Sequence, residues 1–329
     1  MTDNLTNSGS PRILALTGGV GGAKLALGLS KVLPPEQLLF AVNTGDDFEH
    51  LGLHISPDID SLTYALAEQN NHELGWGRAG ETWQFIETLG ALGGEDWFRL
   101  GDKDLALHVR RSELLRGGAT LTEATATITH AMGIRHRVVP MSDDPVRTIV
   151  HTADGELAFQ HYFVRERCAP AVTGFSFSGV DNATLNPQLE AWLATCDGIV
   201  LCPSNPYVSV APLLKLPGFA EALRRLPVVA VTPIVGGMAI KGPAAKMMAE
   251  LNVPASASAV ATHYERAFPG LLDGFVVDET DPEEVQLVDK LGTIRAIATN
   301  TIMVTLPDRV ALAETTLGFL QDLARAKGS

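Results

Sequence analysis

Residues 14–25 read Leu14-Ala15-Leu16-Thr17-Gly18-Gly19-Val20-Gly21-Gly22-Ala23-Lys24-Leu25, an apolar run that ends in four glycines and resumes with helical periodicity. This order predicts a strand, a phosphate-binding loop and a helix. Glycines let the backbone turn tightly and approach a ligand, while the start of the helix offers N–H groups and the positive end of its dipole. We therefore expect an anion at Gly18, Gly19, Gly21 and Gly22.

The class of ligand is not decided by this loop. Its spacing is neither G-x-x-x-x-G-K-S/T nor G-x-G-x-x-G, the patterns of mononucleotide and dinucleotide loops. A plain turn in front of a helix is the simpler alternative, because glycine pairs are common in turns. The position favours a ligand, since a loop after the first strand of an open α/β sheet opens onto the crevice in which ligands bind.

Short apolar runs alternate with helical patterns along the chain. Such runs are typical of buried parallel strands joined by helices. We therefore predict an α/β fold, with a Rossmann-like, mainly parallel sheet, helices on both faces and a smaller, mostly helical elaboration. The runs that indicate strands are residues 12–16, 38–43, 198–202, 228–232 and 274–277.

The domain organisation follows from where this alternation is interrupted. Residues 12–61 and 182–325 carry the strand-helix pattern and are expected to form the Rossmann-like core. Residues 62–181 have a different, mostly helical texture and are expected to form an inserted subdomain beside the sheet. Residues 1–11 are rich in Ser, Thr, Asn and Gly and predict a disordered tail.

Composition limits the function classes. The chain has 329 residues, 46% of them hydrophobic, and a formal net charge of −13. This charge disfavours nucleic acid and anionic membranes as partners. We see no secretory signal and no apolar span of transmembrane length, so we expect a cytoplasmic protein. Cys168, Cys196 and Cys202 have no metal-ligand spacing and are expected to be reduced thiols.

Four aspartates follow the second predicted strand within fifteen residues: Asp46, Asp47, Asp58 and Asp60. Such hard oxygen ligands at a strand end suit Mg²⁺, which takes one or two protein carboxylates and completes its shell with water and phosphates. Asp46 is the first choice for the metal because it lies closest to the strand. Each aspartate could instead cap a helix or form a turn, and for Asp58 both interpretations stay open.

Two further segments offer polar groups for a planar or phosphorylated ligand. Arg99 follows Trp97 and Phe98, and its flat guanidinium can stack on a heterocycle, although a solvated surface charge is the usual explanation. Ser204 and Asn205 lie between prolines directly after a predicted strand. Their hydroxyl, amide and backbone donors are suited to a phosphate or to the edge of a base.

Taken together, these segments resemble the 2-phospho-L-lactate transferase family of coenzyme F-420 biosynthesis. The resemblance implies a Mg²⁺-dependent homodimeric enzyme. Such an enzyme transfers the phospho-acid of a guanylyl-activated three-carbon acid to the ribityl hydroxyl of 7,8-didemethyl-8-hydroxy-5-deazariboflavin and releases GMP. The motifs that carry it are residues 17–24, 43–47, 55–60, 100–104, 141–145, 203–206 and 241–244.

The resemblance also implies roles for individual residues. It places Asp60 and Arg99 at the deazaflavin acceptor, Asp46 at the metal, and the glycine loop with Ser204 and Asn205 at the donor. Residues 62–181 then lie on the acceptor side. Transfer to an alcohol needs alignment and charge neutralisation, which the loop N–H groups, Lys24 and Mg²⁺ can supply. Asp60 is expected to orient the acceptor hydroxyl or to accept its proton.

Two other function classes remain open from the sequence. A nucleotide-binding oxidoreductase could use Asp46 or Asp47 for a ribose, but the chain lacks G-x-G-x-x-G. A non-catalytic nucleotide or deazaflavin sensor of the same fold is the other alternative, which the presence of Asp46, Asp60 and Arg99 disfavours. No motif distinguishes lactyl, enolpyruvyl and glyceryl donors.

Overall fold

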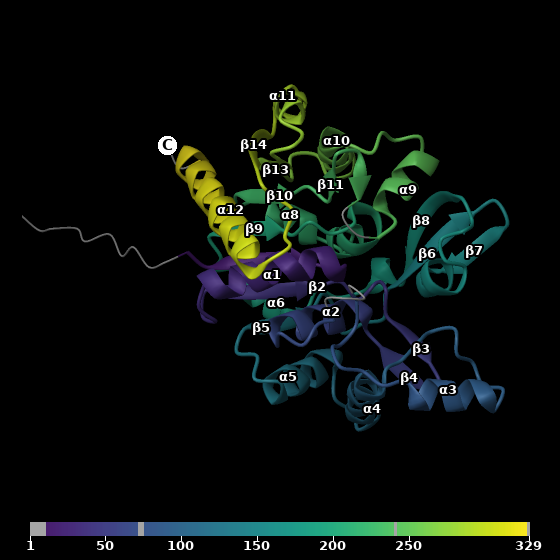
Figure 1. The fold of residues 1–329 in the computed structure, drawn as a ribbon. Helices are drawn as coiled ribbons and strands as arrows, with labels where there is room; N and C mark the ends of the chain where they lie inside the picture. Colours follow the sequence, from purple (N-terminus) through teal and green to yellow (C-terminus); the bar gives the residue numbers. More distant parts are fainter. Residues whose placement is uncertain (1–10, 72–75, 240–241, 328–329) are drawn as a thin grey trace, which may run out of the picture.

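The fold is that of a computed structural model, which describes residues 11–71, 76–239 and 242–327 (Figure 1). The tail expected over residues 1–11 lies outside the described residues except for Pro11. Lys241, from the last motif of the family resemblance, lies outside them as well.

A seven-stranded sheet forms the centre of the molecule, in the order β14-β13-β10-β9-β1-β2-β5. All six neighbouring pairs are parallel. The predicted Rossmann-like α/β fold is therefore confirmed. The five predicted strands correspond to β1 (Ile13–Thr17), β2 (Leu38–Val42), β9 (Gly198–Leu201), β10 (Val228–Val231) and β13 (Gly274–Asp278); β5 (Arg137–Pro140) and β14 (Arg295–Thr299) are added at the two edges.

Helices cover both faces of this sheet because successive strand side chains point to opposite sides. Ile13 and Ala15 of β1 belong to one apolar core, and Leu14 and Leu16 belong to the other. The first core is covered by α1 (Gly19–Val32), α2 (Pro57–Leu66), α5 (Leu121–Ala131) and α12 (Leu306–Lys327). Figure 1 shows α1 and α12 side by side over this face. The second core is covered by α6 (Pro187–Leu193), α7 (Ala211–Leu214), α8 (Phe219–Leu223), α9 (Ala244–Glu250), α10 (Ala257–Ala267) and α11 (Glu283–Asp289).

Smaller elements lie beside the sheet. One group contains helix α3 (Gln84–Ala91), helix α4 (Asp102–Arg116) and the hairpin of β3 (Phe48–His50) and β4 (Leu53–Ile55). A separate antiparallel sheet has the order β7-β6-β8. Its strands are β6 (Arg147–Thr152), β7 (Gly155–Ala158) and β8 (Val172–Ser178), and a two-stranded hairpin pairs β11 (Ile234–Val235) with β12 (Met238–Ala239).

The range expected to form the insert, 62–181, differs from the structure in two respects. It contains β5, which pairs with β2 and forms an edge of the central sheet. The part of this range that lies beside the sheet is therefore divided in two by β5. It also contributes the β7-β6-β8 sheet, so it is less helical than expected.

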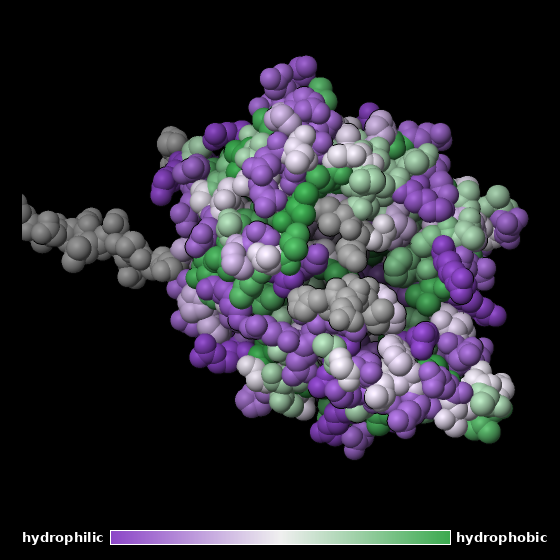
Figure 2. Space-filling view, viewed as in Figure 1, coloured by the Kyte–Doolittle hydropathy of each residue, from purple (hydrophilic) through white to green (hydrophobic). Residues whose placement is uncertain are grey.

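The visible face of the molecule is largely hydrophilic (Figure 2). A green stretch in that view follows the segment that leads into α12, where Ile302, Val304 and Leu306 are exposed. Among the described residues, no helix has the length and apolar character needed to cross a lipid bilayer.

Candidate active site

The glycine loop joins β1 to α1, as predicted from its sequence. Gly19 has a φ of +64°, a left-handed conformation that favours glycine. A Cβ atom at Gly21 would lie 2.6 Å from the carbonyl oxygen of Pro203, and one at Gly22 would lie 2.4 Å from Ser204 Oγ. These glycines therefore let the start of α1 approach the loop that follows β9.

Two amides of the glycine loop have partners from within the protein. The N–H of Gly18 donates to Ser204 Oγ at 3.1 Å, and the N–H of Gly19 donates to Asp58 Oδ1 at 2.6 Å. The group that accepts from the start of α1 in this structure is therefore the side chain of Asp58. Asp58 does not cap its own helix α2, which begins at Pro57.

The loops after β1, β2 and β9 meet at one edge of the sheet, because these three strands are parallel neighbours. Asn43, directly after β2, donates through Nδ2 to Asp58 Oδ2 at 2.9 Å and to the carbonyl oxygen of Val208 at 3.2 Å. Its Oδ1 accepts from the N–H of Gly45 at 2.9 Å. Asn43 thereby links the loop after β2 to the start of α2 and to the turn that follows β9.

Three buried carboxylates form an acidic cluster at this edge: Asp46, Asp47 and Asp58. Asp47 Oδ2 accepts from Ser56 Oγ at 2.8 Å and lies 3.0 Å from His54 Nε2. The Oδ1 atoms of Asp46 and Asp47 are buried and have no hydrogen-bond partner among the described residues. Buried polar atoms without a partner are costly, so these two oxygens indicate a place for a cation or a proton.

The electrostatics of the acidic cluster favour the same interpretation. Burial raises the pKa of Asp58 to about 7, although hydrogen bonds from Asn43 and Gly19 oppose this increase. Burial also raises the pKa of Asp46 well above its ordinary value, and the negative charge of Asp58 raises it further. Burial thus disfavours the charged forms of Asp46 and Asp58, and a bound cation would favour them.

A complete metal cage from protein side chains is absent from the described part of the chain. No group of three or more His, Cys, Asp or Glu side chains lies where it could hold a metal ion. The two unpartnered oxygens of Asp46 and Asp47 still fit Mg²⁺, which commonly takes one or two carboxylates and fills its remaining positions with water and substrate phosphates. The donor set thus fits a metal that is shared with a substrate.

The other donor-side residues expected from the sequence take different positions. Ser204 is buried, and it lies beside the glycine loop because its Oγ accepts from the N–H of Gly18. Asn205 accepts from the N–H of Tyr207 at 2.9 Å and donates to Met247 Sδ at 3.4 Å, so it begins the π-helical turn Pro206–Val210. Lys24 lies on α1 and is half-buried.

The two residues expected at the acceptor have no contact with each other. Asp60 is buried on α2, where both of its carboxylate oxygens accept from the guanidinium of Arg111. Arg99 is exposed, and its guanidinium carbon lies 4.5 Å from the centre of the Trp83 ring. The guanidinium of Arg99 thus faces an indole of the protein itself, and its stacking on a ligand heterocycle stays a prediction.

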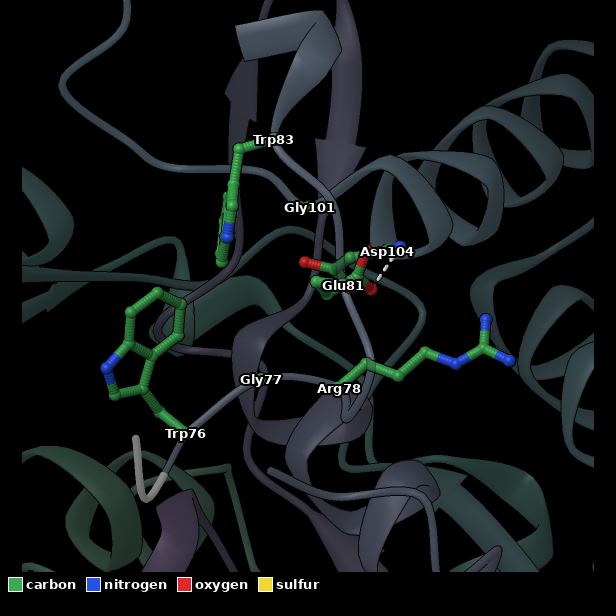
Figure 3. Close-up of a pocket in the computed structure, with 7 residues that line it drawn as sticks. All are labelled: Trp76, Gly77, Arg78, Glu81, Trp83, Gly101 and Asp104. Carbon is green, nitrogen blue, oxygen red and sulfur yellow. Dashed lines mark hydrogen bonds between the residues drawn. The ribbon is translucent and has the colours of Figure 1, made fainter. Parts of the chain in front are cut away.

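A small pocket lies next to Trp83, and its residues were not found by sequence reasoning (Figure 3). The rings of Trp76 and Trp83 stand on one side of it, with centres 6.4 Å apart. The carboxylate of Glu81 accepts from the N–H groups of Lys103 and Asp104 at 2.8 and 2.9 Å and so caps α4. Two tryptophans close together in the stretch 76–83 were the available signal for an aromatic site.

Comparison with known proteins identifies the family. Residues 13–300 match the family described as 2-phospho-L-lactate transferase CofD. The chain belongs to the CofD family. It is therefore a CofD-type transferase, as the motif resemblance implied.

Curated relatives of this transferase carry two different names. The chain is 36% identical to 2-phospho-L-lactate transferase from Methanosarcina mazei, over 92% of the chain and 98% of that protein. It is 38% identical to phosphoenolpyruvate transferase from Streptomyces griseus, over 95% of the chain and 99% of that protein. The fold is also similar to a crystal structure of a UPF0052 family member from Bacillus halodurans, with a TM-score of 0.63, 15% identity and coverage of 94% of this chain and 99% of that one.

Proposed function

We propose that this CofD-type transferase moves a phospho-(three-carbon acid) group from a guanylyl-activated donor to 7,8-didemethyl-8-hydroxy-5-deazariboflavin in coenzyme F-420 biosynthesis. The donor is a lactyl-, enolpyruvyl- or glyceryl-diphosphoguanosine. The ribityl hydroxyl oxygen of the acceptor forms a bond to the phosphorus that bears the acid. The diphosphate bond breaks, GMP leaves, and the hydroxyl proton is released.

The acidic cluster beside the glycine loop is the observation that carries this proposal. A protein with a net charge of −13 that binds a diphosphate needs a local source of positive charge. Asp46 and Asp47 would hold Mg²⁺ through the oxygens that have no partner among the described residues. When bound, the ion would neutralise charge on the phosphoryl oxygens and the leaving phosphate.

The remaining donor-side residues bind and orient. The amides of Gly21 and Gly22, Ser204 and Lys24 border the same edge of the sheet, where they would contact the phosphates of the donor. The carboxylate of Asp58 accepts from the N–H of Gly19 and so holds the start of α1 in place before substrate arrives.

The acceptor is proposed to bind on the side of α3 and α4. Trp76 and Trp83 offer flat apolar surfaces for a planar tricyclic ring, and Arg99 lies over Trp83. Asp60 would orient the ribityl hydroxyl or accept its proton. The homodimeric state and the cytoplasmic location are proposed from the family resemblance alone.

Purified protein mixed with each of the three donors, the deazaflavin and Mg²⁺ tests the proposal. We expect GMP release together with a deazaflavin product whose mass contains the transferred phospho-acid. Comparing the three donors by mass spectrometry identifies the acid. Absence of GMP release with all three donors would refute the proposed reaction and favour a sensor.

A further inference from the structure

Helices α2 and α4 face each other across a line of polar side chains, here called the α2–α4 seam. Asp60 and Tyr64 are one turn apart on α2, and Asp104, His108 and Arg111 lie on successive turns of α4. Residues at these spacings lie on one face of a helix. Tyr64 contacts Asp104, and Asp60 contacts both His108 and Arg111, so these pairs join the two helices. The remaining contacts of His108, with Asp104 and Arg111, lie along α4.

The guanidinium of Arg111 forms two hydrogen bonds with the carboxylate of Asp60. Its side chain is 1% exposed, and NH1 donates to Asp60 Oδ2 at 3.1 Å while NH2 donates to Oδ1. Such a paired contact fixes the plane of the carboxylate as well as its position. Apolar side chains of similar volume often stabilise a fold as well as a buried ion pair does, so stability alone does not account for this one.

His108 connects Asp60 to Asp104. Its Nδ1 lies 3.3 Å from Arg111 NH1 and 3.6 Å from Asp60 Oδ2, while its Nε2 lies 3.3 Å from Asp104 Oδ2. A guanidinium can only donate hydrogen bonds, so the Nδ1 that faces it acts as an acceptor. The remaining ring nitrogen, Nε2, lies near Asp104 Oδ2 without forming a hydrogen bond, so the link between His108 and Asp104 is one of proximity and charge.

Asp104 belongs both to the seam and to the lining of the pocket beside Trp76 and Trp83. Its Oδ1 accepts from the hydroxyl of Tyr64, and its backbone N–H donates to Glu81. It also lines the pocket next to Trp76 and Trp83 (Figure 3). A continuous set of contacts therefore runs from the carboxylate of Asp60 to the wall of this pocket.

We propose that Arg111 and His108 are positioning residues, which fix the carboxylate of Asp60 for the acceptor hydroxyl and connect it to the pocket beside Trp76 and Trp83. This inference rests on the proposed function, because that function brings the hydroxyl to Asp60. Neither Arg111 nor His108 would touch the substrate. Arg111 acts through Asp60, and His108 acts through Asp60 and Asp104.

Substitutions at Arg111 test the first half of the proposal. For Arg111→Met we expect kcat to fall by about tenfold to a hundredfold, with the KM for the donor unchanged, because a misplaced Asp60 affects the chemical step. Arg111→Lys should recover part of kcat, since lysine keeps the charge but loses the fork. The matched control is Arg110→Met, which removes an exposed arginine of the same helix that pairs with Glu113 and not with Asp60.

Substitutions at His108 test the second half and remain informative if Arg111→Met does not fold. In His108→Asn the amide lies where Nδ1 was, so the side that faces Asp60 and Arg111 is kept and the side that faces Asp104 is lost. We therefore expect kcat to persist while the KM for the acceptor rises. In His108→Gln the amide lies where Nε2 was, so the side that faces Asp60 and Arg111 is lost. We therefore expect kcat to fall. His130→Gln, an exposed histidine on α5, is the control.

The outcomes separate the two proposals. A wild-type protein that releases no GMP would refute the proposed function and this inference together. An active wild type, with folded Arg111→Lys and His108→Gln variants that keep its kcat and both KM values, would refute this inference alone. A lower melting temperature with unchanged kcat would likewise show that the seam only stabilises the fold.

Discussion

Raising the pH without a divalent cation is expected to destabilise this transferase. The size of the loss in unfolding free energy follows from the pKa of Asp58. Burial raises the pKa of Asp58 from 3.8 to about 7 in the folded protein. A raised carboxylate pKa contributes stability that is fully present below the unfolded pKa and is lost as the pH rises through the folded one. Between pH 5 and pH 8 this loss amounts to about 3 kcal/mol. Asp46 shifts in the same direction and adds to it.

The assay is denaturant unfolding at a series of pH values in the presence of a chelator. The buried His50 and the partly buried His136 and His263 oppose the effect, because desolvation lowers their pKa values and their contribution is lost as the pH falls. The variant Asp58→Asn keeps these histidines and removes the titrating carboxylate. The difference in unfolding free energy between wild type and Asp58→Asn therefore reports the contribution of Asp58 together with its effect on Asp46.

Two results would refute this reasoning. Parallel pH profiles of wild type and Asp58→Asn would show that Asp58 does not hold a proton near neutral pH. A wild type that gains no stability from Mg²⁺ at pH 8 would show that no cation replaces that proton. If Mg²⁺ binds the cluster, the expected gain is about 2.7 kcal/mol at a hundredfold excess over its Kd.

Three further perturbations test other parts of the site. Asp46→Ala should lower kcat by about a hundredfold and weaken the dependence on Mg²⁺, measured as GMP release during Mg²⁺ titration; ordinary turnover would contradict the metal assignment. Arg99→Ala should raise the KM for the deazaflavin about two- to fivefold with little change in kcat, the size of an exposed cation–π contact; an unchanged KM would remove Arg99 from the acceptor site. Gly21→Ala should lower the melting temperature, at a cost of about 1–3 kcal/mol, because its Cβ would meet the Pro203 carbonyl oxygen. Gly318→Ala in α12, where nothing lies within 4 Å, should instead be neutral or stabilising, and equal effects of the two would contradict the packing argument.

The central strands could be predicted from the sequence, whereas the edge strands could not. Every residue of β1, β2, β9, β10 and β13 is buried, so each of these strands appears as a continuous apolar run. The edge strand β14 has no fully buried residue and begins with the exposed Arg295. An edge strand has a neighbour on one side only, and its sequence is correspondingly mixed.

The candidate site could be predicted where its residues are close in sequence. Asp46 and Asp47 follow β2 directly, and the structure places both in the acidic cluster. The partner of Asp60 could not be found in this way, because Arg111 is separated from it by 51 residues. The spacing of His108 and Arg111 on one helix face was the available signal, but it does not identify which carboxylate they face.

The position of β1 in the middle of the sheet has a consequence for how the protein is made. One neighbour of β1 is β2, but the other is β9, which begins about 180 residues later in the chain. Until the ribosome has released β9, one side of β1 has unpaired backbone groups that can pair with another chain. A nascent chain that stops before Gly198 also lacks Ser204. We therefore expect chaperones to contact this protein during most of its synthesis, and an amino-terminal fragment to aggregate without binding substrate.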